Sequence, residues 1–597
     1  MLRVIGKIIL GLLASLGLVN LLLISSALFI AFRLDDARTQ TLSKPENIVL
    51  TIDLDEGFVE GSGGRQFEGL SLRSQTTLQD AIIAIRNAAD DPRVLGLKAN
   101  LSQQSLGLAQ IQDIRDVIAE FRASGKPTFL YSETIGESVG ALSTYYLASA
   151  FGEIWVQPSG TVGIAGIGAE MPFIKEMLDN LGIKASFLQR REYKSAGEMF
   201  TNSEISPANR QAMEAIVGSW FDQMVSGIAG DRALNTDQVE AMIDRGPMLS
   251  SEALNEGLVD HIGYRDEFES ALPEDISAAT PLTIKRYMAL GPSENGGRPE
   301  KQIAMIHAIG QISRGGSEAN PLVPDQGVLS TPMSKAIRDA ANDDDVDALL
   351  IRVDSPGGSY VASDTIWREI NRAKATSKPI IVSMGNTAAS GGYFIAMPAD
   401  RIFAQPATVT GSIGVILGKI VISEAAEDLG VNFERISFGD SAGMFSSVTD
   451  FTEQDLARLN RMLDATYDDF TQKAAAGREM SREDMEEIAR GRAWSGADAL
   501  DAGLVDELGG LGRAIDYTKT QIGLSEDDPV WLVPFPPPED PFRAILRALE
   551  DGTIPFGIFN LVRTMAWVNE TLAPVVGDIQ AARRGGIQLY ASPISAN

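Results

Sequence analysis

The stretch Tyr145-Tyr-Leu-Ala-Ser-Ala-Phe-Gly-Glu-Ile-Trp-Val-Gln-Pro158 returns in altered form as Tyr393-Phe-Ile-Ala-Met-Pro-Ala-Asp-Arg-Ile-Phe-Ala-Gln-Pro406. The two copies lie 248 residues apart, and further echoes follow in the same order, such as Val49 to Gly61 against Ile303 to Gly315. A separation of this size is that of a whole domain and not of a short structural repeat. The sequence therefore predicts a domain duplicated within one chain.

Each copy alternates short apolar runs with amphipathic ones. In the first copy, Ile48 to Ile52 and Val94 to Ala99 have the pattern of buried strands, and Thr77 to Asn87 that of a helix between them. The second copy repeats this alternation from Ile303 to Ile309 through Pro379 to Met384. Alternating strands and helices are typical of an α/β fold with a mainly parallel sheet, which we expect in both copies.

The length of 597 residues exceeds what one hydrophobic core supports, and we expect five parts. These are an N-terminal stub with anchor and connector (1–45), a first α/β repeat (46–290), a linker (291–300), a second α/β repeat (301–528) and a C-terminal tail (529–597). The linker is dense in glycine and proline. For the tail, packing against the body and contact with a membrane interface are both open, and we assign it no function.

Composition excludes several classes of protein. The net charge of −29 opposes nucleic-acid binding, which needs a basic surface. The chain has no cysteine, which removes thiol nucleophiles, disulfides and thiolate metal sites. Its two histidines, His261 and His307, lie in a turn-like and a strand-like context, so a Ser-His-Asp triad is not expected.

The N-terminal segment predicts a membrane anchor. From Ile8 to Phe32 the chain carries no charge for 25 residues, and as a helix this would span roughly 37 Å, more than the ~30 Å of a bilayer's hydrocarbon core. Arg3 and Lys7 precede it, which places the N-terminus in the cytoplasm and the body of the protein outside. A cleaved secretory signal is the alternative, although its apolar core would be shorter.

The two copies differ in the residues that carry chemistry. Ser390 precedes two glycines in Thr387-Ala-Ala-Ser-Gly-Gly-Tyr393, where the first copy has Leu142. Conversely, Lys194 of the first copy corresponds to Asp440 of the second. A serine of this kind is usually a turn residue and a lysine usually a solvated charge, but the complementary losses favour one composite site built by both repeats.

A serine nucleophile without histidine needs another base, and a lysine whose amine is neutral can serve. Ser390 is expected between a strand and a helix, where the N–H of Gly391 can face an oxyanion. The turn in Asp354-Ser-Pro-Gly-Gly358 follows another strand and can supply a second donor. Ser412, replaced by Ile164 in the first copy, can hydrogen-bond the amine of Lys194.

Nearly the whole chain resembles the signal peptide peptidase A (protease IV) family of membrane-anchored serine proteases. The resemblance rests on the segments above and on Tyr193-Lys-Ser-Ala-Gly197, Thr410-Gly-Ser-Ile-Gly414 and Gly491-Arg-Ala-Trp-Ser-Gly496. The resemblance implies two tandem repeats with a fold similar to Clp protease and crotonase, preceded by an N-terminal transmembrane helix.

The same resemblance assigns roles to five residues. It implies Ser390 as nucleophile, Lys194 as general base, Ser412 as the residue that orients the lysine, and the N–H groups of Gly358 and Gly391 as oxyanion hole. It further implies a homotetramer in the bacterial inner membrane, with a periplasmic catalytic domain that degrades cleaved signal peptides and other unfolded apolar peptides. No metal or organic cofactor is expected.

Two other functions stay open at this point. A crotonase-like acyl-CoA enzyme would share the fold but would need a cytoplasmic nucleotide site, which the orientation of the anchor opposes. A catalytically idle membrane scaffold that binds apolar peptides would have no need of Ser390, Lys194 and Ser412 together.

Overall fold

The computed structural model describes residues 45–61, 76–136, 142–291, 299–315 and 327–537, together with the backbone of 588–590. The predicted anchor, most of the predicted linker and most of the predicted tail lie outside these residues. Among the helices of the described part, none combines the length and apolarity that a membrane crossing needs.

The first repeat forms a six-stranded sheet in which all neighbouring strands are parallel. In spatial order its strands are β8 (His261–Ile262), β4 (Glu153–Val156), β3 (Thr128–Ser132), β2 (Val94–Asn100), β1 (Ile48–Asp53) and β9 (Thr280–Thr283). The helices α2 (Leu78–Asp90) and α3 (Leu108–Ala123) connect successive strands, and Thr77 caps α2 by accepting from the N–H of Asp80. The predicted strands and the predicted helix of this repeat are therefore confirmed.

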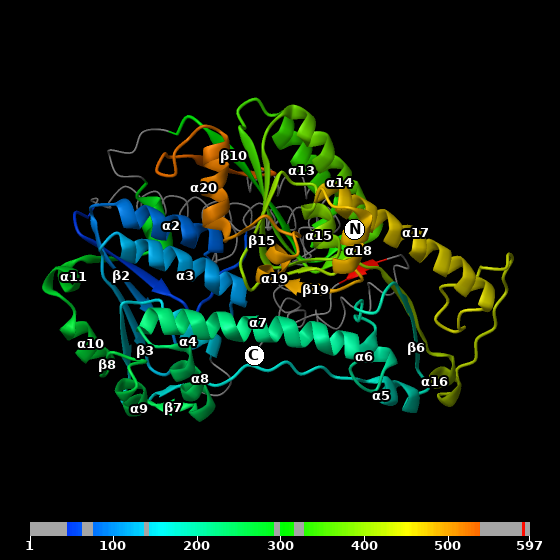
Figure 1. The fold of residues 1–597 in the computed structure, drawn as a ribbon, viewed down its shortest axis with the longest axis horizontal. Helices are drawn as coiled ribbons and strands as arrows, with labels where there is room; N and C mark the ends of the chain where they lie inside the picture. Colours follow the sequence, from blue (N-terminus) through cyan, green and yellow to red (C-terminus); the bar gives the residue numbers. More distant parts are fainter. Residues whose placement is uncertain are drawn as a thin grey trace, which may run out of the picture.

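The second repeat forms an eight-stranded sheet, and six of its strands repeat the order of the first sheet. In the corresponding order these six are β20 (Glu507–Leu508), β16 (Arg401–Ala404), β15 (Ile380–Ala389), β13 (Ala348–Ser355), β10 (Gln302–Ile309) and β21 (Trp531–Phe535). The helices α13 (Ser330–Asn342) and α14 (Tyr360–Ala373) lie against it (Figure 1). The match of two strand orders confirms the duplication at the level of topology.

The second repeat extends further than expected. Strand β21 pairs with β10 as β9 pairs with β1, although residues 531–535 fall in the predicted tail. Pro534 and the prolines after it suggested the end of the repeat, but proline is tolerated in a strand at the edge of a sheet.

The two repeats are joined by structure from both. Strand β6 (Lys184–Gln189) of the first repeat pairs antiparallel with β18 (Ile416–Val421) of the second. The long helix α7 (Pro207–Arg232) runs along both repeats (Figure 1), and the indole N–H of Trp220 donates to the carbonyl of Ala407 at 2.9 Å. One hydrophobic core also contains residues of both, such as Ile82 and Ile515. The interface is thus an extension of the core, and a site can be built across it.

Candidate active site

Ser390 occupies an abrupt junction between a strand and a helix. Strand β15 continues five residues beyond its predicted end at Met384, because Thr387 to Ala389 pair with β17 (Val409–Gly411), and helix α15 (Gly391–Ala396) follows at once. Ser390 lies between them with φ 55° and ψ −114°. A positive φ in a residue other than glycine is uncommon and costs free energy, and such strain concentrates at functional sites.

Lys194 reaches this serine from the first repeat. It lies a few residues after strand β6. The chain that follows this strand contacts the second repeat, because the N–H of Arg190 donates to the carbonyl of Val415 at 3.0 Å. Lys194 Nζ lies 2.7 Å from Ser390 Oγ, and both side chains are buried. The structure therefore brings together the serine and the lysine that the comparison of the two copies singled out.

Ser412 fixes the position of the amine. Lys194 Nζ donates to the carbonyl of Ser412 at 2.9 Å and contacts its hydroxyl at 3.0 Å. Ser412 itself is buried, and its own N–H donates to the carbonyl of Arg492 at 2.7 Å. The amine of Lys194 therefore makes two of these three contacts with Ser412 and the third with Ser390.

Burial lowers the pKa of the Lys194 amine well below its ordinary value, and desolvation is the cause. A charged ammonium in this environment would lose its hydration without gaining a carboxylate partner. The neutral amine is consequently favoured, and its lone pair can accept the proton of the nearby hydroxyl.

Two glycines make room for the backbone and stem of Lys194. A Cβ at Gly491, where φ is +81°, would lie 2.6 Å from the backbone nitrogen of Lys194, and one at Gly414 would lie 3.1 Å from its Cδ. Both glycines belong to segments on which the family resemblance rests, but no role was predicted for either of them. Their closeness to Lys194 depends on contacts between the repeats, which a single sequence does not show.

The two expected oxyanion donors are neighbours. Gly358 lies in β14 (Gly357–Ser359) with φ 152°, and a Cβ there would lie 2.1 Å from the carbonyl oxygen of Ile312. A Cβ at Gly391 would lie 3.1 Å from the backbone nitrogen of Gly358. Gly391 also opens helix α15, where backbone N–H groups have no partner within the helix. Both amides are therefore located beside Ser390.

An extended segment of the chain lies against this loop. The backbone of β22 (Gln588–Tyr590) pairs antiparallel with β14, and it also pairs antiparallel with β18 at Ile416. The space between β14 and β18 thus accommodates a strand, with main-chain pairing on both sides.

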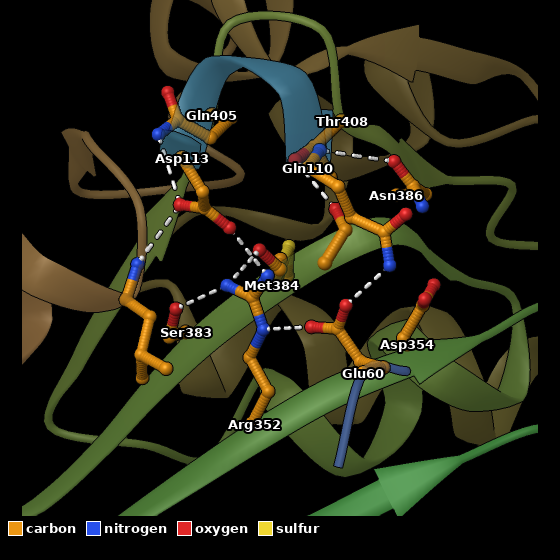
Figure 2. A network of polar contacts seen from close by, with 12 residues as sticks. Glu60, Gln110, Asp113, Arg352, Asp354, Ser383, Met384, Asn386, Gln405 and Thr408 are labelled. Atoms are coloured by element: carbon orange, nitrogen blue, oxygen red, sulfur yellow. Dashed lines mark hydrogen bonds and ion pairs between the residues drawn. The ribbon is translucent and has the colours of Figure 1, made fainter. Parts of the chain in front are cut away.

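A buried polar network lies at the interface of the repeats (Figure 2). Arg352 of β13 is fully buried and forms ion pairs with Glu60 and, at 2.6 Å, with Asp113, both from the first repeat. It also donates to the hydroxyl of Ser383 at 2.8 Å and to the carbonyl of Met384 at 3.0 Å. Burial opposes the charge of Arg352, but the two carboxylates outweigh it and raise its pKa. The network links both repeats to β13 and β15, the strands that lead to Gly358 and Ser390.

Asp354 connects these two strands at their ends. Its carboxylate accepts a hydrogen bond from the N–H of Thr387 at 2.9 Å. Figure 2 shows that Asp354 lies beside Glu60. Burial and the charge of Glu60 raise the pKa of Asp354 to about 7. The contact ties the strand before the glycine turn to the strand before Ser390.

Neither histidine is among the hydrogen-bond partners of the Lys194 amine, which are Ser390 and Ser412. His307 is in β10 and burial lowers its pKa to about 4, while His261 in β8 stacks on Trp155 with ring centroids 4.4 Å apart. Among the described residues, no group of three or more His, Asp or Glu side chains is arranged to hold a metal ion.

Comparison with known proteins identifies the family of the chain. The model of peptidase family S49 matches twice, at residues 120–278 and 372–525. The chain is 32% identical to the protein named serine protease SPPA, chloroplastic, of Arabidopsis thaliana, over 78% of this chain and 69% of that protein. It is also 32% identical to protease 4 of Salmonella typhi, over 76% of this chain and 74% of that protein.

Similarity to solved structures is more distant. A membrane-bound stomatin-specific protease, 1510-N, matches 40% of this chain and 99% of its own, with 15% identity and a TM-score of 0.25. A likeness at that level carries no argument about the site. The family matches cover both repeats, and on them the chain belongs to peptidase family S49 and is a serine protease.

Proposed function

We propose that this protein is a membrane-anchored endopeptidase with a Ser/Lys dyad that degrades cleaved signal peptides and other unfolded apolar peptides. The observation that carries the proposal is the 2.7 Å contact of Lys194 Nζ with Ser390 Oγ at a buried position where desolvation lowers the pKa of the lysine.

In this proposal, Ser390 Oγ attacks the carbonyl carbon of the scissile peptide bond while Lys194 Nζ takes the hydroxyl proton. The oxyanion that forms accepts hydrogen bonds from the N–H groups of Gly358 and Gly391. The lysine then gives its proton to the leaving amine as the C–N bond breaks, which leaves an ester on Ser390. A water molecule, deprotonated by the same lysine, hydrolyses that ester and restores the serine.

The space between β14 and β18 supports a peptide substrate in extended form. A chain that binds there as a strand gains main-chain hydrogen bonds, and this mode does not depend on side-chain identity. A folded protein cannot supply such a free strand, so unfolded peptides are favoured. The choice of signal peptides follows from the family resemblance and from the predicted anchor, since these remnants are apolar and reside in the bilayer.

The proposal includes a location and an assembly. The predicted anchor would hold the chain in the bacterial inner membrane, with its N-terminus in the cytoplasm and the two repeats in the periplasm. A homotetramer is part of the same proposal. No metal, cofactor or nucleic acid enters the reaction.

The test is hydrolysis of a synthetic signal peptide by the full chain in detergent. We expect turnover by the wild type and only background rates for Ser390→Ala and Lys194→Met. Ser334→Ala and Lys519→Met are matched controls, because both replace a buried side chain of the same type elsewhere, and they should retain activity. If folded wild type and dyad variants are equally inactive on several apolar peptides, the protease proposal fails and a peptide-binding scaffold gains support.

A further inference from the structure

Strands β13 and β15 lose their regular pairing just before the active site. Their parallel register is regular up to Val353 opposite Met384, and it resumes at Ser355 opposite Ala388. Between these two pairs β13 has one residue and β15 has three, so β15 forms a β-bulge there. Because a bulge redirects the strand that contains it, this one sets the direction in which β15 arrives at Ser390.

The bulge, residues 385–387, is held by a carboxyl in place of a paired backbone. The N–H of Thr387 donates to Oδ1 of Asp354 at 2.9 Å, and Asp354 is the single residue of β13 opposite the bulge. The two strands also lie close together here, because a Cβ at Gly385 would lie 2.9 Å from the Cβ of Asp354. The side chain of Asp354 therefore accepts the bond that a main-chain carbonyl accepts in a regular ladder.

Two further side chains complete the bulge. The hydroxyl of Thr408 donates to the carbonyl of Gly385 at 2.8 Å, and the side-chain carbonyl of Asn386 accepts from the N–H of Gln110 at 3.2 Å (Figure 2). Gln110 belongs to α3 of the first repeat, so both repeats hold the bulge. Asp354 is the partner that comes from β13, the strand that continues into the glycine turn.

The bulge and its carboxyl belong to the repeat that contains Ser390. In the first repeat the N–H of Leu97 donates to the carbonyl of Pro127, and a shift of 252 residues gives the same bond in the second repeat. By this shift Asp354 corresponds to Ser102. Among the described residues of the first repeat, β2 and β3 pair in one continuous register, and β3 ends without a bulge.

Ion pairing does not explain the carboxyl of Asp354. Arg352 forms its ion pairs with Glu60 and Asp113. Burial and the charge of Glu60 raise the pKa of Asp354 to about 7, although the charge of Arg352 opposes this. Ionisation of Asp354 therefore costs free energy, whereas its bond to Thr387 can be accepted by the neutral acid as well as by the carboxylate.

We propose that Asp354 is a positioning residue for the reaction: by holding the bulge, it fixes Ser390 relative to the N–H of Gly358. The inference rests on the proposed Ser/Lys mechanism, in which this N–H stabilises the oxyanion. Beyond the bulge the chains are in close contact, since a Cβ at Gly392 would lie 2.4 Å from the carbonyl oxygen of Ser355. Loss of the bond to Asp354 would shift β15 against the glycine turn, while the space for a substrate strand between β14 and β18 would remain.

The test is hydrolysis of the synthetic signal peptide by the full chain in detergent, with kcat and KM measured separately. We expect Asp354→Ala to lower kcat by roughly tenfold or more with little change in KM, because a small misplacement of reacting groups slows the reaction. Asp354→Asn should retain most of the rate, because its amide oxygen accepts the same bond from Thr387. Asp400→Ala is the matched control, because the carboxylate of Asp400 accepts from the N–H of Ile380 at 2.9 Å, at the opposite end of β15.

Labelling of Ser390 by a fluorophosphonate is measured in the same variants, because it needs the serine and the oxyanion donors but no peptide. Slower labelling of Asp354→Ala that is restored in Asp354→Asn supports the proposal independently of the peptide chosen. Unchanged kcat and labelling in Asp354→Ala, or equal losses in both variants when circular dichroism shows them folded, would overturn it. A wild type that is labelled but hydrolyses no peptide would contradict the proposed function, and the labelling rates would still decide the role of Asp354.

Discussion

Lys194 illustrates how burial alone can favour the neutral form of an amine, which a general base requires. Its amine has contacts to Ser412 and Ser390 but loses the water that would stabilise its charge. The lowered pKa has two consequences that can be measured separately: the amine can accept a proton near neutral pH, and folding must release one.

Replacement of Lys194 by methionine should therefore change how stability depends on pH. The ordinary pKa of lysine is 10.5 and the folded value is well below it, so between these values the unfolded chain binds one more proton and wild-type stability rises with pH. The slope is about 1.4 kcal/mol per pH unit. The methionine variant lacks this slope, so from pH 8 to pH 9 the free energy of unfolding of the wild type should rise by that amount relative to the variant.

Denaturant unfolding at both pH values measures the difference in the free energy of unfolding. Lys335→Met, at a largely exposed lysine, is the control. A difference between Lys194→Met and the wild type that stays constant over this range would show that the amine is not neutral in the folded protein.

Gly491 should affect the rate because it makes room for Lys194. In Gly491→Ala the new Cβ would meet the backbone of Lys194 and displace its amine from Ser390, so kcat should fall by roughly tenfold or more while the protein stays folded. Gly257→Ala has a similar φ of +77° with open space around its Cβ, so it shares the backbone strain without the collision. Equal kinetics for the two variants, measured with the synthetic signal peptide, would contradict the role of Gly491.

The sequence predicted Ser390 and Lys194 because each is absent from the other copy, and a duplicated chain reveals such differences without any relatives. Gly391 and Ser412 were also suggested by the residues themselves, whereas Gly358 was singled out within its glycine turn by the family resemblance. Gly491 could not be recognised in this way, because its importance comes from a contact with Lys194 almost 300 residues away, and glycine is frequent in turns for many other reasons.

At the scale of elements, the site lies where β13 and β15 end. Contacts between the two repeats hold these ends of the strands in position. The sequence predicted both strands from their apolar runs. It missed the last part of β15, because Gly385-Asn-Thr-Ala-Ala389 has one β-branched residue, Thr387, and no aromatic residue, and is otherwise made of residues that are uncommon in strands. That part is a strand because β17 pairs with it, which is a tertiary contact.

Arg352→Met should destabilise the junction of the repeats. The substitution leaves Glu60 and Asp113 buried without their cation, and breaking a buried ion pair in this way costs about 3–5 kcal/mol. Arg482→Met removes an exposed pair with Asp468 and should change the free energy of unfolding by less than about 1 kcal/mol. Urea unfolding measures the free energy of unfolding of both variants. If Arg352→Met lowers it by as little as the control does, the network has no structural role.

At the scale of the whole molecule, the proposed mechanism divides one reaction between the two repeats. In it, the first repeat supplies the amine, and the second supplies the hydroxyl and both backbone donors. The shared core and the β6–β18 pairing hold these parts together. Neither repeat alone contains both members of the dyad, so the catalytic unit of this account is the entire chain.

The most direct measurement of that claim is the rate at which a fluorophosphonate probe labels the full chain, followed by mass spectrometry across a range of pH. The account predicts labelling at Ser390 that becomes faster as pH rises, levels off once Lys194 has lost its proton, and is nearly absent in Lys194→Met. Labelling of Ser390 at an undiminished rate in Lys194→Met, or labelling of a different serine, would contradict a site shared between the repeats.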